Sequence, residues 1–376
     1  MATKLLLLSI LIIKLLIFID AQSVGVCNGR VGNNLPSEQD VVNLYRRNGI
    51  TRMRIYDPNQ ATLRALGGTN IELILDVPND RLQELTDPNA AAAWVQNNIR
   101  NYPNVRFRYI SVGNEVDPDK GSGRFLSFVL PAMKNVQKAI QDAGLQIKVS
   151  TATYTGLLKT SYPPSDGAFK DNVVGYIQPI IRFLSENNSP MLANIYPYFA
   201  YLDANLDLSY ALFTKPDNGE QYKNLFDAIF LSENNSPMLA NIYPYFAYLD
   251  ANLDLSYALF TKPDNGEQYK NLFDAMYDAH YAAQSRLGGA NVPIVVSESG
   301  WPSAEDKGAT LENAGTYYRN LIAHVKSGQG TPARPGRLIE TYLFAMFDEN
   351  LKPDKKSEKH FGVFSPNQSS KYNLRF

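Results

Sequence analysis

The chain has 376 residues, 44% of them apolar and 11% aromatic, so it can bury a large core in one big domain or two ordinary ones. Lys and Arg number 36 and Asp and Glu number 37, which gives a formal net charge of −1. Because the sequence has no basic run and no charge-biased half, we expect neither a nucleic acid nor a membrane as a partner.

The first 21 residues, MATKLLLLSILIIKLLIFIDA, have the pattern of a secretory signal peptide. Lys4 precedes an apolar run that ends at the small residue Ala21. Lys14 interrupts this run, which falls short of the ~20 apolar residues that a membrane span needs. The pattern therefore predicts a signal peptide over 1–21, a mature domain over 22–376, and secretion.

The sequence has too few cysteines and histidines to suggest disulfide bonds or a metal site. The only cysteine, Cys27, lies in the apolar run VGVCNG, so it predicts a buried thiol and allows no internal disulfide. The three histidines, His280, His324 and His360, are far apart and lack the spacing of metal ligands. We expect no bound metal.

Beyond the signal, apolar β-like runs alternate with helical stretches. One such stretch, 128–144, has apolar residues spaced near 3.6 and ends at Gly144, a typical C-cap residue. The β-like runs are 24–29, 51–57, 71–77, 108–116, 147–154, 191–198, 292–299 and 339–347.

Eight such alternations predict a parallel sheet closed into a (β/α)₈ TIM barrel. The competing architecture is a doubly wound open sheet, which usually carries a G-x-G-x-x-G turn after its first strand. The stretch CNGRVGNN at 27–34 has two glycines without that spacing, so the barrel is favoured.

A tandem duplication surrounds the sixth β run. Residues 183–228 are identical to 230–275, an offset of 47. A solenoid needs about three or more repeats, usually with diverged sequences, so we interpret the tract as one unit of a barrel written twice. Perfect identity fits a very recent duplication or an error in the assembled sequence. A closed barrel has no place for a ninth strand, so we expect one copy to enter it and about one unit to be extruded.

Two glutamates follow apolar β runs at positions where barrel enzymes carry their catalytic groups. Glu115 ends the run ISVGNEV, and Glu298 lies near the end of IVVSES. Either one alone could be a rim carboxylate that backbone hydrogen bonds satisfy. Facing each other across one cleft, they would supply the two carboxyl groups that glycoside hydrolysis requires, one protonated and one ionised. Like charge and partial burial would raise the pKa of the acid.

The stretches VVSESGWPSA (295–304), YISVGNEV (109–116), NIYPYF and ETYLFAMFDENLK (340–352) resemble the plant endo-β-1,3-glucanases of glycoside hydrolase family 17. The resemblance covers nearly all of the mature chain. It implies a barrel with an open groove for β-1,3-glucan, a retaining double displacement and no cofactor. Carried over by motif, Glu298 is the nucleophile and Glu115 the acid/base. Retention requires their carboxyl groups to lie roughly 5–5.5 Å apart.

The resemblance also suggests secondary roles. Asn114 matches a residue that hydrogen-bonds the sugar 2-hydroxyl, although it could simply be a loop amide at the strand end. Glu349 and Lys352 match a pair near the family's active site, although a surface ion pair is the alternative. Aromatic faces suit the apolar side of a pyranose ring, although most barrel aromatics belong to the core. The candidates for stacking are Tyr56, Tyr196, Tyr243, Trp301 and Phe347.

The sequence departs from the family at Asn28, which replaces the tyrosine of a Cys-Tyr-Gly motif. A shorter amide loses stacking area, which could lower activity or shift subsite preference.

The sequence shows no C-terminal extension of the vacuolar kind, which favours extracellular delivery to the apoplast or cell wall. Asn367 lies in a glycosylation acceptor pattern. Two alternatives stay open: a mixed-linkage 1,3;1,4-β-glucanase, and a glucan-binding pseudoenzyme impaired by the duplication. We expect a monomer.

Overall fold

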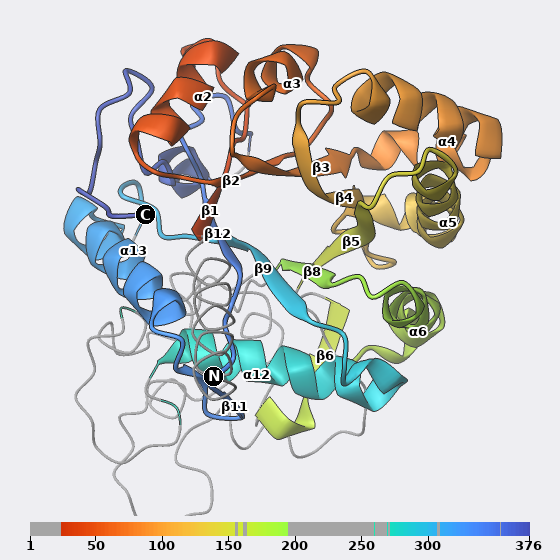
Figure 1. The fold of residues 1–376 in the computed structure, drawn as a ribbon. Coiled ribbons are helices and arrows are strands. Elements are labelled where there is room, and N and C mark those ends of the chain that lie inside the picture. Colours follow the sequence, from red (N-terminus) through yellow and green to blue (C-terminus); the bar gives the residue numbers. More distant parts are fainter. Residues whose placement is uncertain are drawn as a thin grey trace, which may run out of the picture.

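The computed structural model describes residues 24–154, 157–160, 164–194, 259, 269, 271–306, 309–353 and 355–376. Eight parallel strands close into a barrel in the order β1-β12-β9-β8-β5-β4-β3-β2. Their positions match the eight β runs expected from the sequence, so the (β/α)₈ prediction is confirmed (Figure 1). The barrel strands are β1 (Val24–Cys27), β2 (Arg52–Ile55), β3 (Glu72–Val77), β4 (Arg106–Asn114), β5 (Lys148–Tyr154), β8 (Met191–Asn194), β9 (Ile294–Ser299) and β12 (Thr341–Phe344).

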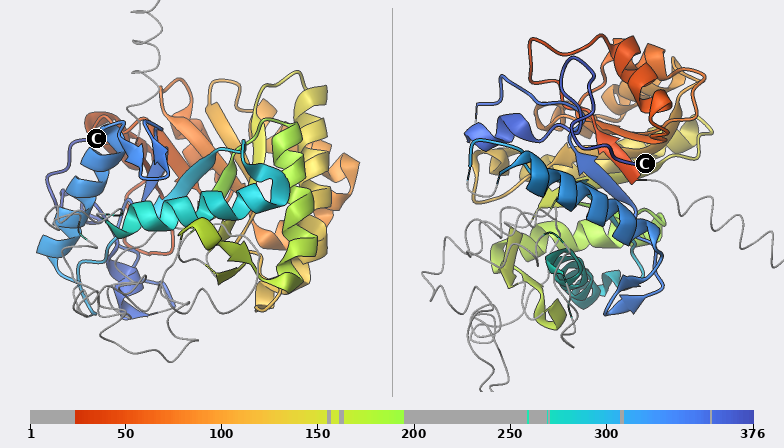
Figure 2. Two further views of the ribbon diagram at one scale, coloured as in Figure 1. Left: turned by 90° about the horizontal axis from the view of Figure 1, so that it is seen from below. Right: turned by 90° about the vertical axis from the view of Figure 1, so that its left-hand side faces the viewer.

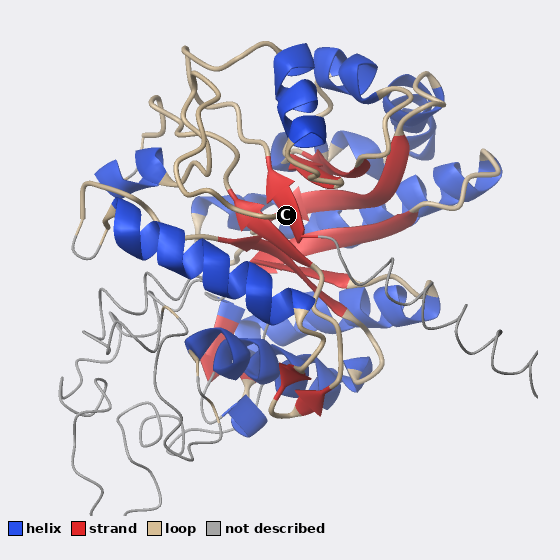
Figure 3. Cartoon of the chain, turned by 60° about the vertical axis from the view of Figure 1, so that its left-hand side comes forward, coloured by secondary structure: helices blue, strands red, loops and turns tan. Residues whose placement is uncertain are grey.

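Helices surround the strands on the outside, as the views in Figures 2 and 3 show. They are α2 (Glu38–Arg47), α3 (Gln60–Leu66), α4 (Pro88–Val95), α5 (Leu126–Asp142), α6 (Asp171–Glu186), α12 (Leu272–Gln284) and α13 (Leu311–Lys326). Two small hairpins pair β6 (Leu158–Thr160) with β7 (Ala168–Phe169), and β10 (Gly330–Thr331) with β11 (Arg334–Pro335). None of the helices described has the length and apolarity needed to cross a bilayer.

Local sequence signals explain where the helices begin and end. The α2 helix starts after Ser37, whose hydroxyl accepts a hydrogen bond from Asp40 N at 3.2 Å and so caps a free amide. The α5 helix ends before Gly144, which has φ +71° and whose N–H donates to the carbonyl of Gln141. The C-cap is Ala143, and the predicted residue Gly144 directly follows it.

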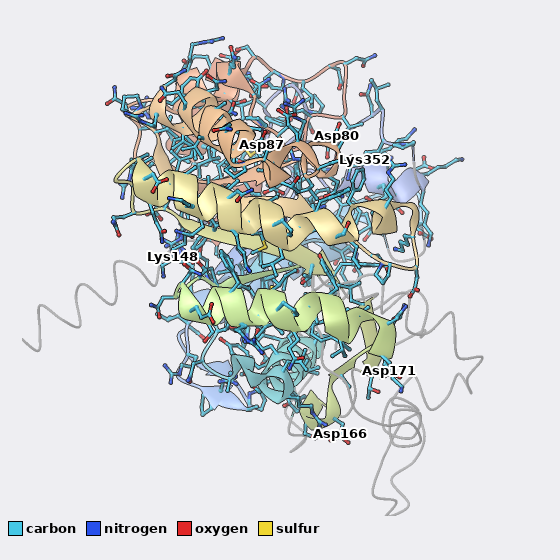
Figure 4. All side chains as sticks on the ribbon, turned by 90° about the vertical axis from the view of Figure 1, so that its right-hand side faces the viewer. Asp80, Asp87, Lys148, Asp166, Asp171 and Lys352 are labelled. Atoms are coloured by element: carbon cyan, nitrogen blue, oxygen red, sulfur yellow. The ribbon has the colours of Figure 1, made fainter. Side chains whose placement is uncertain are left out.

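The inside of the barrel is charged at both ends. On β2, Met53 and Ile55 are fully buried apolar residues, whereas Arg52 and Arg54 alternate with them and pair with carboxylates of other strands. At the N-terminal end Arg52 pairs with Glu72 at 3.0 Å, and further pairs join Arg108 and Glu340. Nearer the C-terminal end, Arg54 pairs with Asp76 and Glu298. Figure 4 labels Lys148, the first residue of β5, and Lys352, which lie at opposite ends of the barrel.

The two copies of the duplicated tract contribute different elements. Strand β8 belongs to the first copy and pairs with β5 and β9, so the closed barrel contains the sixth strand once. Helix α12 begins in the second copy at Leu272. Two further residues of the second copy contact the barrel's helices: Leu259, whose carbonyl accepts from Asn320 of α13, and Tyr269, whose hydroxyl donates to Asp278 at 3.1 Å. The expected extruded unit lies outside the described residues.

Candidate active site

A cavity of ≈ 410 Å³ opens at the C-terminal end of the barrel strands. Its lining comes from the ends of β1, β2, β4, β9 and β12 and from the loops that follow them. Glu115 and Glu298 both line it, as expected from their positions at the C-terminal ends of β4 and β9. The lining residues are Asn28, Gly29, Arg30, Val31, Tyr56, Asp57, Asn114, Glu115, Glu298, Phe344, Glu349 and Lys352.

The carboxylate of Glu298 is held on one oxygen by two donors from β2 and its end. Arg54 Nη1 lies 2.9 Å from Glu298 Oε1, and the hydroxyl of Tyr56 donates to the same oxygen at 2.7 Å. Glu298 is only 4% exposed, so the guanidinium supplies the charge that a buried carboxylate needs. Burial and the charge of Glu298 raise the pKa of Tyr56 well above its usual value, so Tyr56 remains a donor.

Arg54 joins the nucleophile candidate to two further groups. Its Nη2 atom donates to Asp76 Oδ2 at 2.7 Å and to Asn114 Oδ1 at 3.0 Å. Arg54 is fully buried and Asp76 is 1% exposed, so both lie behind the lining residues Asn114 and Glu298, which Arg54 contacts. Sequence analysis missed both residues. The sequence signal for Arg54 is that two arginines alternate with apolar residues on one strand. Helices cover the outside of a barrel, so side chains as polar as these must face its interior and find acidic partners there.

Glu115 follows β4 directly and lies in a sharp backbone turn. Its φ is +52°, in the left-handed region that residues with a Cβ rarely adopt, and Gly113 two residues before has φ +83°. Between them, the backbone of Asn114 makes two hydrogen bonds with the Asn79 side chain. The Asn114 amide oxygen accepts from Arg54, so this side chain belongs to the cavity network rather than only to the strand end.

Glu349 and Lys352 lie together on the opposite wall. Lys352 Nζ is 3.7 Å from Glu349 Oε2 and also 3.3 Å from Glu358. Glu349 is 3% exposed and accepts from the backbone N–H of Val31 at 2.8 Å, so this is a largely buried pair. Gly29 makes the arrangement possible, because a Cβ there would lie 2.4 Å from Glu349 Oε1.

Two of the aromatic residues expected to contact sugar do not reach the cavity, and those predictions are wrong. Trp301 is fully buried and packs against Tyr317 of α13, with ring centroids 5.5 Å apart. Phe347 is 2% exposed and forms a β-bridge with Phe364. Tyr56 does line the cavity. Tyr196 and Tyr243 lie outside the described residues.

The end of β1 and the loop after it place Cys27, Asn28 and Arg30 at or next to the cavity. Asn28, which stands where the family has tyrosine, lines the cavity but is only 2% exposed. Cys27 beside it is a buried thiol, as predicted, and donates to the Ser297 carbonyl at 3.2 Å; burial raises its pKa. Arg30 Nη2 lies 2.6 Å from Asp57 Oδ2, and this ion pair, which the sequence did not suggest, borders the cavity.

The part of the chain that the structure describes has few side chains that could bind a metal together. No group of three or more His, Cys, Asp or Glu residues there could hold a metal ion.

The fold and cavity agree with comparisons to known proteins. The family model described as glycosyl hydrolases family 17 matches residues 24–230 and 228–376, two segments that meet where the first copy ends and the second begins. A glucan endo-1,3-beta-glucosidase A from Solanum lycopersicum is 51% identical over 99% of this chain and 98% of its own. A glucan endo-1,3-beta-glucosidase from Vitis vinifera is 53% identical over 96% of this chain and 93% of its own.

Among solved structures, CJP38, a beta-1,3-glucanase and pollen allergen of Cryptomeria japonica, is similar throughout. Its TM-score is 0.78 at 42% identity, over 94% of this chain and 99% of that chain. A second structure, of plant beta-glucan endohydrolases with distinct substrate specificities, has a TM-score of 0.76 at 40% identity, over 94% of this chain and 100% of that chain.

Proposed function

Because the chain belongs to glycosyl hydrolase family 17, we propose that it hydrolyses internal 1,3-β-D-glucosidic bonds in β-1,3-glucans such as callose or fungal wall glucan. The observation that carries the proposal is the single cavity that Glu115 and Glu298 both line. The two similar chains from tomato and grape, named as glucan endo-1,3-beta-glucosidases, support the same linkage.

The mechanism is a double displacement with retention. Glu298 attacks the anomeric carbon while Glu115 protonates the departing glycosidic oxygen, and a covalent glycosyl-enzyme forms. Glu115 then takes a proton from the incoming water, which releases the product with its original anomeric configuration. The two donors on Glu298 Oε1, one of them a guanidinium, suit a carboxylate that attacks rather than one that gives up a proton.

The other polar residues of the cavity bind the sugar. Asn114 holds the 2-hydroxyl of the reacting glucose, since Arg54 fixes its amide oxygen and so leaves the amide NH₂ as the donating end. Glu349 and Lys352 bind hydroxyl groups on the opposite wall, and Tyr56 contributes an aromatic edge beside the nucleophile.

The protein acts outside the cell, in defence or in cell-wall turnover. Residues 1–21 direct secretion, and 22–376 form one catalytic domain that works as a monomer, without a cofactor and without nucleic acid or membrane partners. The apolar leader sequence and the near-neutral charge support this assignment.

The test measures the release of reducing ends from soluble β-1,3-glucan and from a mixed-linkage 1,3;1,4-β-glucan by the secreted protein. We expect activity on the first substrate and weak activity on the second. Glu298→Ala and Glu115→Gln should each lower kcat by about 10³-fold or more. Glu312→Gln, at an exposed glutamate in the first turn of α13, is the matched control and should keep full activity.

Three outcomes separate the alternatives. Faster cleavage of the mixed-linkage glucan would make the protein a mixed-linkage enzyme. Binding of β-1,3-glucan without turnover would identify a pseudoenzyme. Full activity of Glu298→Ala would overturn the assignment of the nucleophile, and NMR of the first-formed anomer tests retention directly.

A further inference from the structure

The backbone at Glu115 needs outside support to hold its conformation. A residue with a Cβ at φ +52° stores about 1–3 kcal/mol of strain and persists only where its surroundings fix it. The direction of the Glu115 side chain depends on this turn, because the left-handed conformation aims the Cα–Cβ bond differently from an extended strand. The groups that fix the turn therefore decide where the carboxyl group lies in the cavity.

The side chain of Asn79 clamps the residue before the turn. Its Oδ1 atom accepts from Asn114 N at 2.8 Å, and its Nδ2 atom donates to Asn114 O at 2.7 Å. Both polar groups of the Asn114 backbone are thereby held by a single amide. Asn79 follows β3, so it connects the end of that strand to the end of β4.

The hydroxyl of Ser122 clamps the residue after it. Ser122 Oγ donates to Glu115 O at 3.1 Å and accepts from Asp117 N at 3.1 Å, which closes residues 115–122 into a compact loop. On the other side, Glu115 N donates to the carbonyl of Ala152 on β5 at 2.9 Å. Every backbone polar group of residues 114 and 115 thus has a partner outside the turn.

The loop that carries Ser122 is itself anchored to β5. The hydroxyl of Tyr154 donates to Asp117 Oδ2, and Asp117 is 1% exposed. Burial and the hydrogen bond to Asp117 raise the pKa of Tyr154 well above its usual value, so the phenol keeps its proton. Gly123 allows the close return of the chain, because a Cβ there would lie 2.9 Å from the carbonyl oxygens of Asp117 and Pro118.

We propose that Asn79 and Ser122 are positioning residues for the general acid of this enzyme: they hold the Asn114–Glu115 turn and so aim the Glu115 carboxyl group at the departing oxygen. Neither residue is part of the cavity lining, so they act through Glu115 and not on the sugar. The inference rests on the proposed function, in which Glu115 is the acid/base.

This role differs from general support of the fold in one measurable respect. A misplaced acid slows only reactions whose leaving group needs a proton. A poor leaving group, such as the next sugar of a glucan, needs it, whereas a dinitrophenolate departs without protonation. Loss of overall structure would slow both reactions alike.

The experiment compares kcat/KM for β-1,3-glucan and for the 2,4-dinitrophenyl glycoside of a short β-1,3-gluco-oligosaccharide, using the full secreted chain. Ser122→Ala should lower kcat/KM on the glucan by about 100-fold, the usual cost of misplacing a catalytic group. On the dinitrophenyl glycoside the loss should stay within about threefold, because kcat/KM reports the first displacement, which needs no acid there. Ser122→Thr keeps the hydroxyl and should restore most of the glucan activity.

Tyr56→Phe is the matched control, because it weakens the hold on Glu298 and should lower both rates by similar factors. Equal losses on the two substrates for Ser122→Ala would overturn the positioning role. If Ser122→Ala does not yield folded protein by thermal denaturation, the same comparison with Asn79→Ala decides the question. Wild-type protein that cleaves neither substrate would instead contradict the proposed function.

Discussion

Asp76 is a buried acid that makes stability depend on pH in an unusual direction. It is 1% exposed and pairs with Arg54, with Nη2 to Oδ2 at 2.7 Å and Nε to Oδ1 at 3.3 Å. Burial raises its pKa from 3.8 to about 6, even though the Arg54 charge lowers it. Removal from water thus outweighs the ion pair at this position.

The pKa of Asp76 is about 6 in the folded protein and 3.8 in the unfolded chain, and this difference fixes how stability changes with pH. Between pH 4 and pH 6 the folded protein holds a proton on Asp76 that the unfolded chain has lost. The free energy of unfolding therefore falls as the pH rises through this window, and Asp76 causes no further loss above it. At about 1.36 kcal/mol per pKa unit, the whole change is about 3 kcal/mol. Asp76→Asn removes the titration and keeps the shape of the side chain.

Urea denaturation at pH 4, 5, 6 and 7, followed by tryptophan fluorescence, measures this contribution. The variant should gain about 2–2.5 kcal/mol relative to wild type between pH 4 and pH 7, nearly all of it below about pH 6.5. Asp80→Asn, at an exposed aspartate four residues along, is the control for the same substitution on the surface. A difference for Asp76→Asn that is constant across the four pH values would refute the reasoning.

Three further predictions follow from the cavity and its surroundings. Gly29→Ala places a methyl group 2.4 Å from Glu349 Oε1, so we expect a loss of about 1–3 kcal/mol in thermal denaturation together with weaker glucan binding. Tyr56→Phe removes a donor from Glu298 and should lower kcat/KM on the glucan by about 10- to 100-fold; an unchanged value would mean that the hydrogen bond has no catalytic role. Trp301→Ala should cost about 3–5 kcal/mol of stability with KM unchanged; a raised KM at unchanged stability would return this residue to the groove.

The sequence predicts the barrel because periodicity and alternation are local signals. Each β run is a short apolar stretch bounded by polar or turn residues, and the eight expected runs overlap the eight observed strands. The same logic placed Glu115 and Glu298 at strand ends and hence in one cavity. The count of eight fits a closed barrel, and the absence of a G-x-G-x-x-G turn after the first run argues against an open doubly wound sheet.

The misses concern the direction of side chains and long-range pairing. Trp301 lies two residues after the end of β9, but only the tertiary structure shows that its ring packs against Tyr317 instead of lining the cavity. Arg54 lies in the stretch TRMRIYD, where alternate arginines suggest a solvent-facing side. In a barrel that side is the interior, where Arg54 pairs with Asp76 on the next strand, β3, and with Glu298 on β9, which is remote in sequence.

The first copy supplies β8 and the second copy supplies the start of α12. The connection between these two elements is therefore a natural insertion point. Its ends are anchored by Asn194 in the first copy and Leu272 in the second, on a barrel that keeps eight strands. The chain between them adds no ninth strand to the barrel that the described residues form. Evolution can therefore enlarge this βα connection at the catalytic rim independently of the core, and a protein engineer can graft a foreign domain there for the same reason.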